Sequence, residues 1–407
     1  MIISPANRTL SVKEYYFSIK NKEIARLNAD RAARGLDPVI NLGIGSPDGS
    51  PSPEVVDALC ACARKSGVHG YQSYTGIPEL LEAIAAWYRK WYGVTLDPAT
   101  EIQPLMGSKE GILLLSLAFL NPGDKVLVPN PGYPTYTSAT RMCEARLVNY
   151  DLVEADGWYP DFEALEKMDL EGVKIMWVNY PNMPTGAPAR QDVFEKLVAF
   201  AKRHGILLVN DNPYGFILNE PQSILSVPGA REVCLEMNSL SKSHNMAGWR
   251  VGMMLGSAEV IRELLKVKTQ MDSGMFRGIQ EAAAEALKTD AAWYESLNAE
   301  YRRRQSVARR IMDLLGCAYD PAAGGLYVWG RIPENPGQAG NVTPGSDRVS
   351  PAEALSDRIL YDAGVFLTPG FIFGSNGAHH LRISLCADVP TLERAYAKVR
   401  EMQLIDK

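Results

Sequence analysis

The chain has 407 residues, of which 46% are hydrophobic and 22% are charged, and its formal net charge is -5. This composition is typical of an ordered globular protein, and the length favours two domains because single cores stop growing near ~250 to 300 residues. A negative net charge without a basic cluster argues against nucleic acid as a partner. The longest apolar stretch, Ile112 to Leu120, is too short for a membrane helix, which needs ~20 residues.

The six cysteines are scattered, and none forms a Cys-x-x-Cys pair, which argues against a disulfide framework and against structural zinc. The five histidines, including the adjacent His379 and His380, lack the spacing of metal ligands. The first ten residues, MIISPANRTL, lack the charged-then-apolar layout of a secretory signal. We therefore expect reduced thiols, no bound metal and a cytoplasmic location.

The first part of the chain combines helical patterns with glycine-rich turns. Helices are predicted at Val12–Arg31, Pro53–Arg64, Pro78–Tyr92 and Ile112–Leu120. A short strand from Val39 runs into a turn that ends at Asp48, where Gly43 and Gly45 permit close backbone approach to a ligand. A second turn, Gly107 to Gly111, opens a helix whose free N–H groups favour an anion. Helix capping by Ser108 is the simpler alternative for this turn.

From Lys125 the chain alternates strands and helices in the way that predicts a mainly parallel sheet. Nearly continuous apolar runs mark four strands, at Lys125–Val128, Lys174–Val178, Ile206–Asn210 and Val233–Met237. Each run is followed by a polar loop, namely Asn130–Pro134, Asn179–Gly186, Asn210–Tyr214 and Ser239–Ser243. Because ligands collect outside the carboxyl ends of parallel strands, we predict the functional site at these loops.

Beyond Gly256 a long helical region is expected to reach about Leu315, and the remainder has an α+β pattern. Strands are predicted there at Leu326–Gly330 and His380–Leu385, and helices at Pro351–Asp362 and Leu392–Met402. The loop Ile332–Ser350 is long enough to indicate mobility or a role at the mouth of a site. The fold class predicted is therefore α/β, with a smaller α+β domain.

The segment Ser239 to Gly256 places Lys242 between two apolar runs, close to the hydroxyls of Ser239 and Ser241. Arg250 follows, and its planar guanidinium suits a phosphate. A lysine beside such an anion site can form an imine with a carbonyl cofactor. From these residues alone, a solvated basic loop remains the alternative.

Taken together, these motifs resemble the fold type I pyridoxal-phosphate enzymes and, within them, the class I/II aminotransferases. The similarity runs in order from about Asn41 to Arg382, and Gly107–Pro134 and Asp272–Phe276 are most similar to the subgroup of LL-diaminopimelate and alanine aminotransferases. The resemblance implies a seven-stranded sheet, pyridoxal 5'-phosphate as cofactor, and a homodimer with sites between subunits. The expected division is an N-terminal arm and part of the small domain at 1–48, a large cofactor-binding domain at 49–295, and the rest of the small domain at 296–407.

The resemblance also implies roles for the residues near the cofactor ring. Lys242 is expected to hold the cofactor covalently and to move a proton between the substrate and cofactor carbons. Asp211 is expected to pair with the ring nitrogen and Tyr214 with the phenolic oxygen. Tyr133 is expected to stack on the ring, for which a core aromatic is the alternative.

The resemblance further implies how the phosphate and the substrate are held. The phosphate contacts are expected from Ser108, the backbone of Lys109, Ser239, Arg250, and Tyr71 of a neighbouring subunit. A packed loop tyrosine is the alternative for Tyr71. Arg382 is expected to clamp the α-carboxylate of the substrate, with the backbone N–H of Gly45 as a second donor. A surface ion pair is the alternative for Arg382.

One position departs from the family pattern. Where the family has Asn-Pro-Thr-Gly, this chain has Met183 before Pro184, so a thioether that cannot donate replaces an amide that does. We hypothesise that Tyr214 alone donates a hydrogen bond to the phenolic oxygen.

The activity that the resemblance implies is transfer of an amino group between an L-amino acid and a 2-oxo acid. A carbon-sulfur β-lyase and a non-catalytic ligand sensor remain as alternatives.

Overall fold

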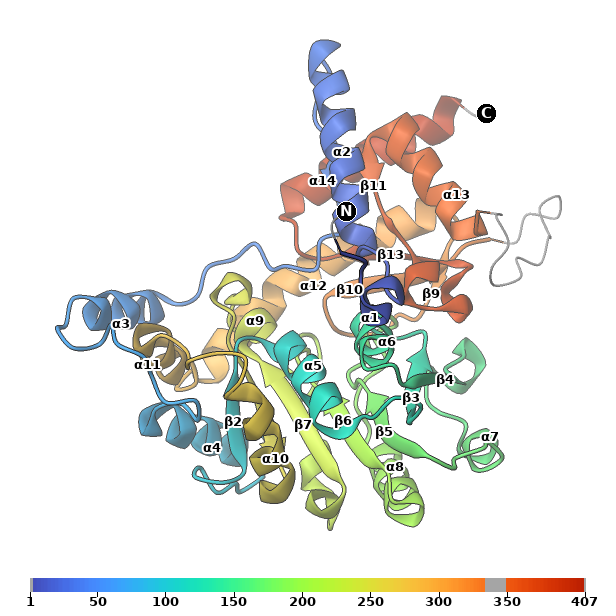
Figure 1. The fold of residues 1–407 in the computed structure, drawn as a ribbon. Coiled ribbons are helices and arrows are strands. Elements are labelled where there is room, and N and C mark those ends of the chain that lie inside the picture. Colours follow the sequence, from blue (N-terminus) through green and yellow to red (C-terminus); the bar gives the residue numbers. More distant parts are fainter. Residues whose placement is uncertain (1–2, 334–348, 406–407) are drawn as a thin grey trace.

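The computed structural model describes residues 3–333 and 349–405. Its largest feature is a seven-stranded sheet in the order β2-β8-β7-β6-β5-β3-β4 (Figure 1). These strands are β2 (Ile102–Leu105), β3 (Lys125–Asn130), β4 (Arg146–Asp151), β5 (Val173–Val178), β6 (Leu207–Asp211), β7 (Cys234–Ser239) and β8 (Gly252–Gly256). Strand β8 runs antiparallel to both of its neighbours, and the other pairings are parallel. The predicted mainly parallel sheet is confirmed.

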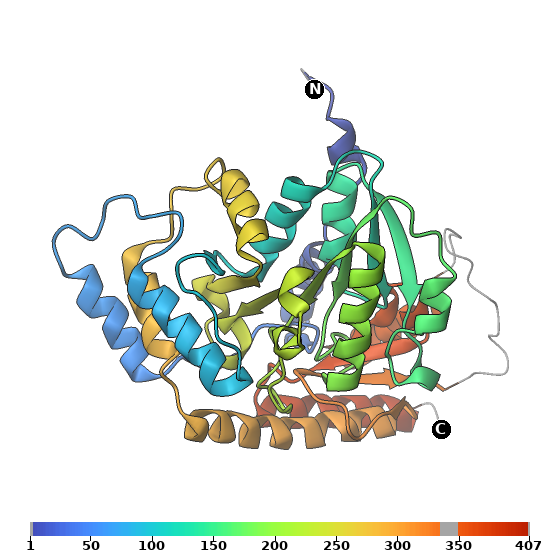
Figure 2. The same cartoon turned by 90° about the horizontal axis from the view of Figure 1, so that it is seen from below.

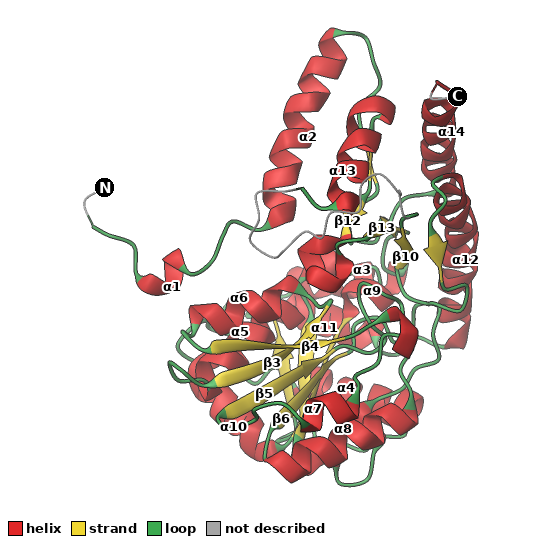
Figure 3. Cartoon of the chain, turned by 90° about the vertical axis from the view of Figure 1, so that its right-hand side faces the viewer, coloured by secondary structure: helices red, strands yellow, loops and turns green. Residues whose placement is uncertain are grey.

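Helices cover both faces of this sheet (Figures 1 and 3). One face is covered by α5 (Ser108–Phe119), α6 (Pro134–Met142) and α10 (Ala258–Lys268), and the other by α4 (Pro78–Tyr92), α8 (Gln191–His204) and α11 (Arg277–Ala286). Side chains alternate between the faces, so Val209 and Leu235 pack toward the first set while Leu208 and Cys234 pack toward the second. This double burial is why the strands read as continuous apolar runs.

Smaller helices complete this layer. Beside α11 lies α3 (Pro53–Ala63), and α7 (Phe162–Glu166) follows β4. The short helix α9 (Leu240–Ser243) follows β7 directly, with Ser239 as its N-cap. The short helix α1 (Asn7–Leu10) contacts α6, where the Ser11 hydroxyl donates to the backbone oxygen of Arg141 at 3.2 Å.

A second region holds a four-stranded sheet in the order β12-β13-β10-β9 and a parallel pair of β1 with β11. Its strands are β1 (Ile40–Asn41), β9 (Ala318–Tyr319), β10 (Tyr327–Arg331), β11 (Val365–Phe366), β12 (Thr368–Pro369) and β13 (His380–Ser384). Its helices are α2 (Tyr16–Ala33), α12 (Ala291–Leu314), α13 (Pro351–Arg358) and α14 (Val389–Ile405). Helices α12 and α14 lie side by side along one edge of the molecule (Figure 2).

The N-terminal helix α2 belongs to this second region. Its Lys20 forms an ion pair with Asp357 of α13 at 3.1 Å, and Ile24 packs against Leu360 and Phe366. Residues 11–15 therefore cross from α1, on the large sheet layer, to the second region. Strand β1 and helix α2 thus join residues 16–41 to elements near the C-terminus.

The structure differs from the sequence predictions in several places. The single helical region expected after Gly256 is three helices, because Ser257 caps α10, Asp290 caps α12, and a turn with Gly274 at a φ of 83° precedes α11. Strand β4 was not predicted because its side chains are partly exposed and polar. The short strand predicted from Val39 is β1, which is two residues long. The predicted loop Ile332–Ser350 lies mostly outside the described residues.

Candidate active site

A cavity of about 360 Å³ lies at the carboxyl ends of the parallel strands β3, β5, β6 and β7, where it meets the second region. It is lined by most of the residues that the sequence singled out, namely Gly45, Ser108, Lys109, Tyr133, Asp211, Tyr214, Ser239, Lys242, Arg250 and Arg382. Met183 lines it as well. The volume is within the range of cofactor and substrate pockets.

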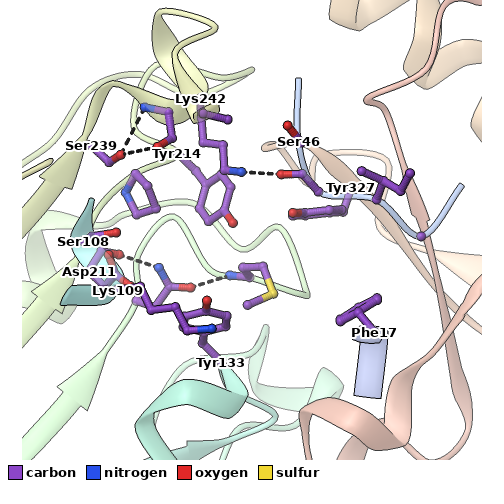
Figure 4. A pocket seen from close by; sticks show the side chains of 18 of the residues that line it. Phe17, Ser46, Ser108, Lys109, Tyr133, Asp211, Tyr214, Ser239, Lys242 and Tyr327 are labelled. Atoms are coloured by element: carbon purple, nitrogen blue, oxygen red, sulfur yellow. Dashed lines mark hydrogen bonds between the residues drawn. The ribbon is translucent and has the colours of Figure 1, made fainter. Parts of the chain in front are cut away.

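Lys242 is the amine in this cavity, and it stands on α9 rather than in the predicted loop. Its Nζ donates a hydrogen bond to the backbone oxygen of Gly45, across the boundary between the two regions (Figure 4). Burial lowers the pKa of Lys242, and the charges of Arg382 and Arg250 lower it further. A lowered pKa makes the neutral, nucleophilic form of the amine more accessible.

Among the residues that the structure describes, Asp211 is the single acid that lines the cavity, and it is the last residue of β6. One oxygen, Oδ2, accepts a hydrogen bond from the Tyr136 hydroxyl at 2.9 Å, whereas Oδ1 is buried and has no hydrogen-bond partner in the described part of the chain. Burial raises the pKa of Asp211 to about 6, against the opposing effects of the Tyr136 hydrogen bond and the Lys242 charge. An unpaired oxygen on a buried acid is the pattern expected where a cationic ligand group completes the site.

One end of the cavity is built to accept an anion. Helix α5 begins at Ser108, so the N–H groups of Ser108 and Lys109 have no carbonyl partner within the helix. Gly107 precedes it at a φ of 84°, and a Cβ there would collide with the Arg250 guanidinium. Arg250 is itself held at a φ of 57°, a left-handed conformation that arginine rarely adopts. Ser239 completes this end, with its Oγ 2.8 Å from that of Ser241.

Arg382 lies on β13 at the opposite side of the cavity. It is 3% exposed, and in the described ranges no carboxylate forms an ion pair with it. Its guanidinium lies 3.9 Å from the ring centroid of Tyr327 and 4.7 Å from that of Phe373. Nη2 donates to the Gly43 oxygen at 3.1 Å, and Nη1 is 3.5 Å from the Met183 sulfur. Nε is buried and has no hydrogen-bond partner within residues 3–333 and 349–405. A buried, aromatic-flanked guanidinium with a free donor suits a carboxylate from a ligand.

Lys109 adds another cation at the edge of the cavity. Its Nζ lies 4.7 Å from the ring centroid of Tyr15, which belongs to the segment that crosses between the two regions. Burial lowers the pKa of Lys109, and Arg250 lowers it further. Within residues 3–333 and 349–405 it forms no ion pair.

The other predicted site residues differ in whether the structure brings them to the cavity. Tyr133 is half-buried beside the cavity, and Tyr214 is buried at its wall, 6.0 Å from Tyr327 between ring centroids (Figure 4). Gly45 contributes its oxygen to Lys242. Tyr71 is not brought to the site, because its side chain is 92% exposed and does not line the cavity.

Several lining residues were missed by the sequence analysis. Among them are Tyr15, Phe17, Tyr136 and Tyr327. Tyr136 lies three residues after Tyr133, the N-cap of α6, and the two rings lie edge to face with centroids 5.6 Å apart. That spacing was the one available signal. Nothing local marks Tyr15 or Phe17, since they reach the cavity only through the path of the N-terminal segment.

Comparison with known proteins agrees with this geometry. Residues 37–399 match the family model described as aminotransferase class I and II. The chain belongs to the class I and II aminotransferases. The predicted family and enzyme class are thereby confirmed, which favours the aminotransferase interpretation over a β-lyase or a sensor.

This aminotransferase is 39% identical over 402 residues to the LL-diaminopimelate aminotransferase of Oleidesulfovibrio alaskensis, covering 98% of each chain. It is 37% identical to the transaminase BacF of Bacillus subtilis, covering 99% of this chain and 98% of that one. The structure of substrate-bound BacF superposes with a TM-score of 0.87 at 36% identity, covering 98% of both chains. These neighbours confirm the predicted fold class, fold type I. In the described part of the chain, no helix of the aminotransferase combines the length and apolarity needed to cross a membrane.

Proposed function

We propose that this aminotransferase uses pyridoxal 5'-phosphate bound covalently to Lys242. The observation that carries the proposal is one cavity that joins the Lys242 amine, the unpaired oxygen of Asp211 and an anion-binding end built from Ser108, Ser239 and Arg250. These groups match an aldehyde, a protonated ring nitrogen and a phosphate on a single small molecule. When bound, this cofactor supplies an electron sink for the bond that breaks at the substrate α-carbon.

The chain's own residues have the following proposed roles. Lys242 Nζ takes a proton from the substrate α-carbon and returns one to the cofactor side, which its lowered pKa favours. Asp211 Oδ1 accepts a hydrogen bond from the ring nitrogen and keeps that nitrogen protonated. Tyr133 stacks on the ring, and Tyr214 donates to its phenolic oxygen. The backbone of Lys109 joins Ser108 in holding the phosphate.

For substrates, we propose L-amino acids and 2-oxo acids whose α-carboxylate is bound by Arg382, with the Gly45 N–H as a second donor. The unpaired guanidinium Nε and the flanking ring of Tyr327 support this assignment. Lys109 is a further cation without an acidic partner among the described residues, which favours substrates that carry a second acid group. A relative named LL-diaminopimelate aminotransferase is in keeping with this class.

We also propose the division of the chain predicted above, with a large domain at 49–295 and a small domain from 1–48 and 296–407. The separate sheets support it. A homodimer is proposed because Tyr71 is too exposed to serve its own chain's cavity and is free to serve that of a second copy. All six cysteines are unpaired, which supports a reducing compartment such as the cytoplasm.

The experiment is to treat the purified protein with pyridoxal 5'-phosphate and borohydride, and to map the modified peptide by mass spectrometry. We expect one pyridoxyl adduct, on Lys242, which is lost in Lys242→Ala and kept in Lys288→Ala, a control at an exposed lysine paired with Glu285. An adduct elsewhere, or none, overturns the proposal. Amino acids should bleach the visible band of the untreated protein and 2-oxo acids should restore it, whereas pyruvate and ammonia from cystathionine would indicate the β-lyase.

A further inference from the structure

Glu236 is a fully buried carboxylate that the reaction does not use. It lies on β7 and is 0% exposed. Because side chains alternate along a strand, Leu235 and Met237 pack toward α5, whereas Glu236 points to the other face, where α4 lies. In the part of the chain that the structure describes, no cation forms an ion pair with it.

Hydrogen bonds from three separate segments converge on this carboxylate. Oε2 accepts from the Asn210 side chain of β6 at 3.0 Å and from the Ile224 backbone N–H at 3.1 Å. Oε1 accepts from the Tyr88 hydroxyl of α4 at 2.9 Å. Burial raises the pKa of Glu236, and the hydrogen bonds from Asn210 and Ile224 oppose that rise. Glu236 therefore links a strand, a helix and a loop through hydrogen bonds.

One branch of this network leads to the anion-binding end of the cavity. The Tyr88 hydroxyl accepts a hydrogen bond from the Asn238 side-chain nitrogen at 3.0 Å, and Asn238 Oδ1 accepts one from the Ser239 N–H at 2.8 Å. Ser239 is the last residue of β7, and its side chain lies on the cavity face. A chain of hydrogen bonds thus runs from Glu236 through the sheet to the backbone of Ser239.

We propose that Glu236 is a positioning residue for phosphate binding, acting through Tyr88 and Asn238 on the orientation of Ser239. This inference rests on the proposed function, because it assumes that Ser239 contacts the phosphate. A buried carboxylate without a cation carries a desolvation penalty that apolar residues of the same volume would avoid. Packing alone therefore does not account for it, whereas fixed hydrogen-bond directions at the end of β7 do.

The substitution Glu236→Gln isolates the branch to Ser239. The amide oxygen of glutamine can still accept from Asn210 and from the Ile224 N–H. Its NH₂ group then faces the Tyr88 hydroxyl, which already accepts from Asn238, so Tyr88 loses the acceptor for its own proton. Glu236→Gln thus perturbs Tyr88 and Asn238 and leaves the other branch intact.

The test compares the dissociation constants of pyridoxal 5'-phosphate and pyridoxal, which lacks the phosphate, for the full-length cofactor-free protein. We expect Glu236→Gln to weaken binding of the phosphorylated form by about fivefold to tenfold, the effect of one weakened hydrogen bond, and to change pyridoxal binding less than about twofold. Tyr88→Phe should change the two dissociation constants in the same way, and it replaces Glu236→Gln in the test if that variant does not fold. In a Ser239→Ala background, Glu236→Gln should add no further loss, because the two positions act as one unit.

A control for general destabilisation is Tyr150→Phe, which removes another buried hydroxyl, bonded to the Trp177 backbone oxygen at 2.7 Å, and should leave the ratio of the two constants unchanged. Equal weakening of both ligands, or full additivity with Ser239→Ala, would overturn the positioning role. If the unmodified protein does not prefer the phosphorylated form and yields no adduct on Lys242, the proposed function itself fails. If the protein prefers the phosphorylated form and yields the adduct on Lys242, but Glu236→Gln binds both ligands as the parent does, only this inference is refuted.

Discussion

The two faces of strands β6 and β7 carry polar groups of opposite character. On the cavity face, Asp211 has an oxygen that is buried without a partner. On the opposite face, both oxygens of Glu236 accept hydrogen bonds, from donors that include Tyr88, Asn210 and the Ile224 N–H. The two acids lie on adjacent strands, where Asn210 pairs with Glu236 and Asp211 with Met237. Their difference therefore arises from the face on which each side chain lies.

The Asp211 carboxylate thus has an oxygen available to a ligand, whereas the Glu236 carboxylate stabilises the fold through its hydrogen bonds. An unpaired buried oxygen destabilises the folded protein until a ligand bonds to it. Removal of a fully bonded carboxylate destabilises the protein because its buried donors lose their acceptor. Substitutions on the cavity face should thus impair activity and leave or raise stability. Substitutions on the opposite face should reduce stability.

The largest effect is expected for Lys242→Ala on the cavity face. Transaminase activity should fall by at least ~10³-fold, because the nucleophile and the proton carrier are both lost. The free energy of unfolding of the cofactor-free protein should stay unchanged or rise, since burial disfavours the charged amine. Initial rates and urea denaturation measure the two effects. A variant that retains activity, or that is strongly destabilised, would contradict the contrast.

On the opposite face, Glu236→Ala should lower the free energy of unfolding by about 3 to 5 kcal/mol, because several buried donors, among them Tyr88 and Asn210, lose their acceptor at once. Urea denaturation of the cofactor-free protein measures this loss. The matched comparison is Tyr150→Phe, which removes one buried hydrogen bond and should have a smaller effect, about 1 to 2 kcal/mol. A cost for Glu236→Ala no larger than that of the control would argue against the network.

Asp211→Asn should stabilise the cofactor-free protein in a pH-dependent manner. The folded-state pKa of about 6 lies above the ordinary value for aspartate, so the stability contributed by the protonated form is complete below pH ~4 and is lost as the pH rises through 6. Asparagine stays neutral throughout. The variant should therefore equal the parent near pH 4 and exceed it by about 2 to 3 kcal/mol near pH 7.5. Thermal or urea unfolding at several pH values measures this, and a pH-independent difference would contradict it.

Tyr136→Phe should raise the pKa of Asp211 on the cavity face. It removes the one donor that the described residues offer to the Asp211 carboxylate, and since that hydrogen bond lowers the pKa of Asp211, the pKa should rise further. The measurement compares the stability of Tyr136→Phe with that of the double variant Tyr136→Phe/Asp211→Asn at several pH values. The pH midpoint of this difference should lie about one unit above the midpoint found for the parent and Asp211→Asn, equivalent to about 1.4 kcal/mol. An unmoved midpoint would show that the hydroxyl does not act on the acid.

The smallest effect is expected at Met183, where the family pattern has asparagine. Met183→Asn adds a donor where the resemblance places the phenolic oxygen of the cofactor. The pH midpoint of the visible cofactor band should fall by about half a unit, the effect of one modest hydrogen bond. Met183→Leu keeps the apolar volume and should leave the midpoint in place. If the spectral titration of Met183→Asn matched the parent, Tyr214 would not be the sole donor to that oxygen.

Much of the site could be predicted because its residues follow apolar runs that are buried on both faces of a parallel sheet. Lys242, Asp211 and Tyr133 stand at or just beyond such strand ends, and parallel strands bring their carboxyl ends to one edge. Arg382 was found through the family motif, since it lies in a different sheet. Tyr71 stays a prediction, because a single chain does not bring it to the cavity.

The amino-acid sequence by itself determined the mainly parallel sheet and the residues at its carboxyl edge, because hydrophobic periodicity and turn residues act locally. Only the tertiary structure decided which partner each polar group has. Tyr136 bonds to Asp211, Tyr88 bonds to Glu236, and Tyr15 lies beside Lys109. Such contacts join segments that are far apart in the chain, and they depend on side-chain direction and helix placement that no local pattern encodes.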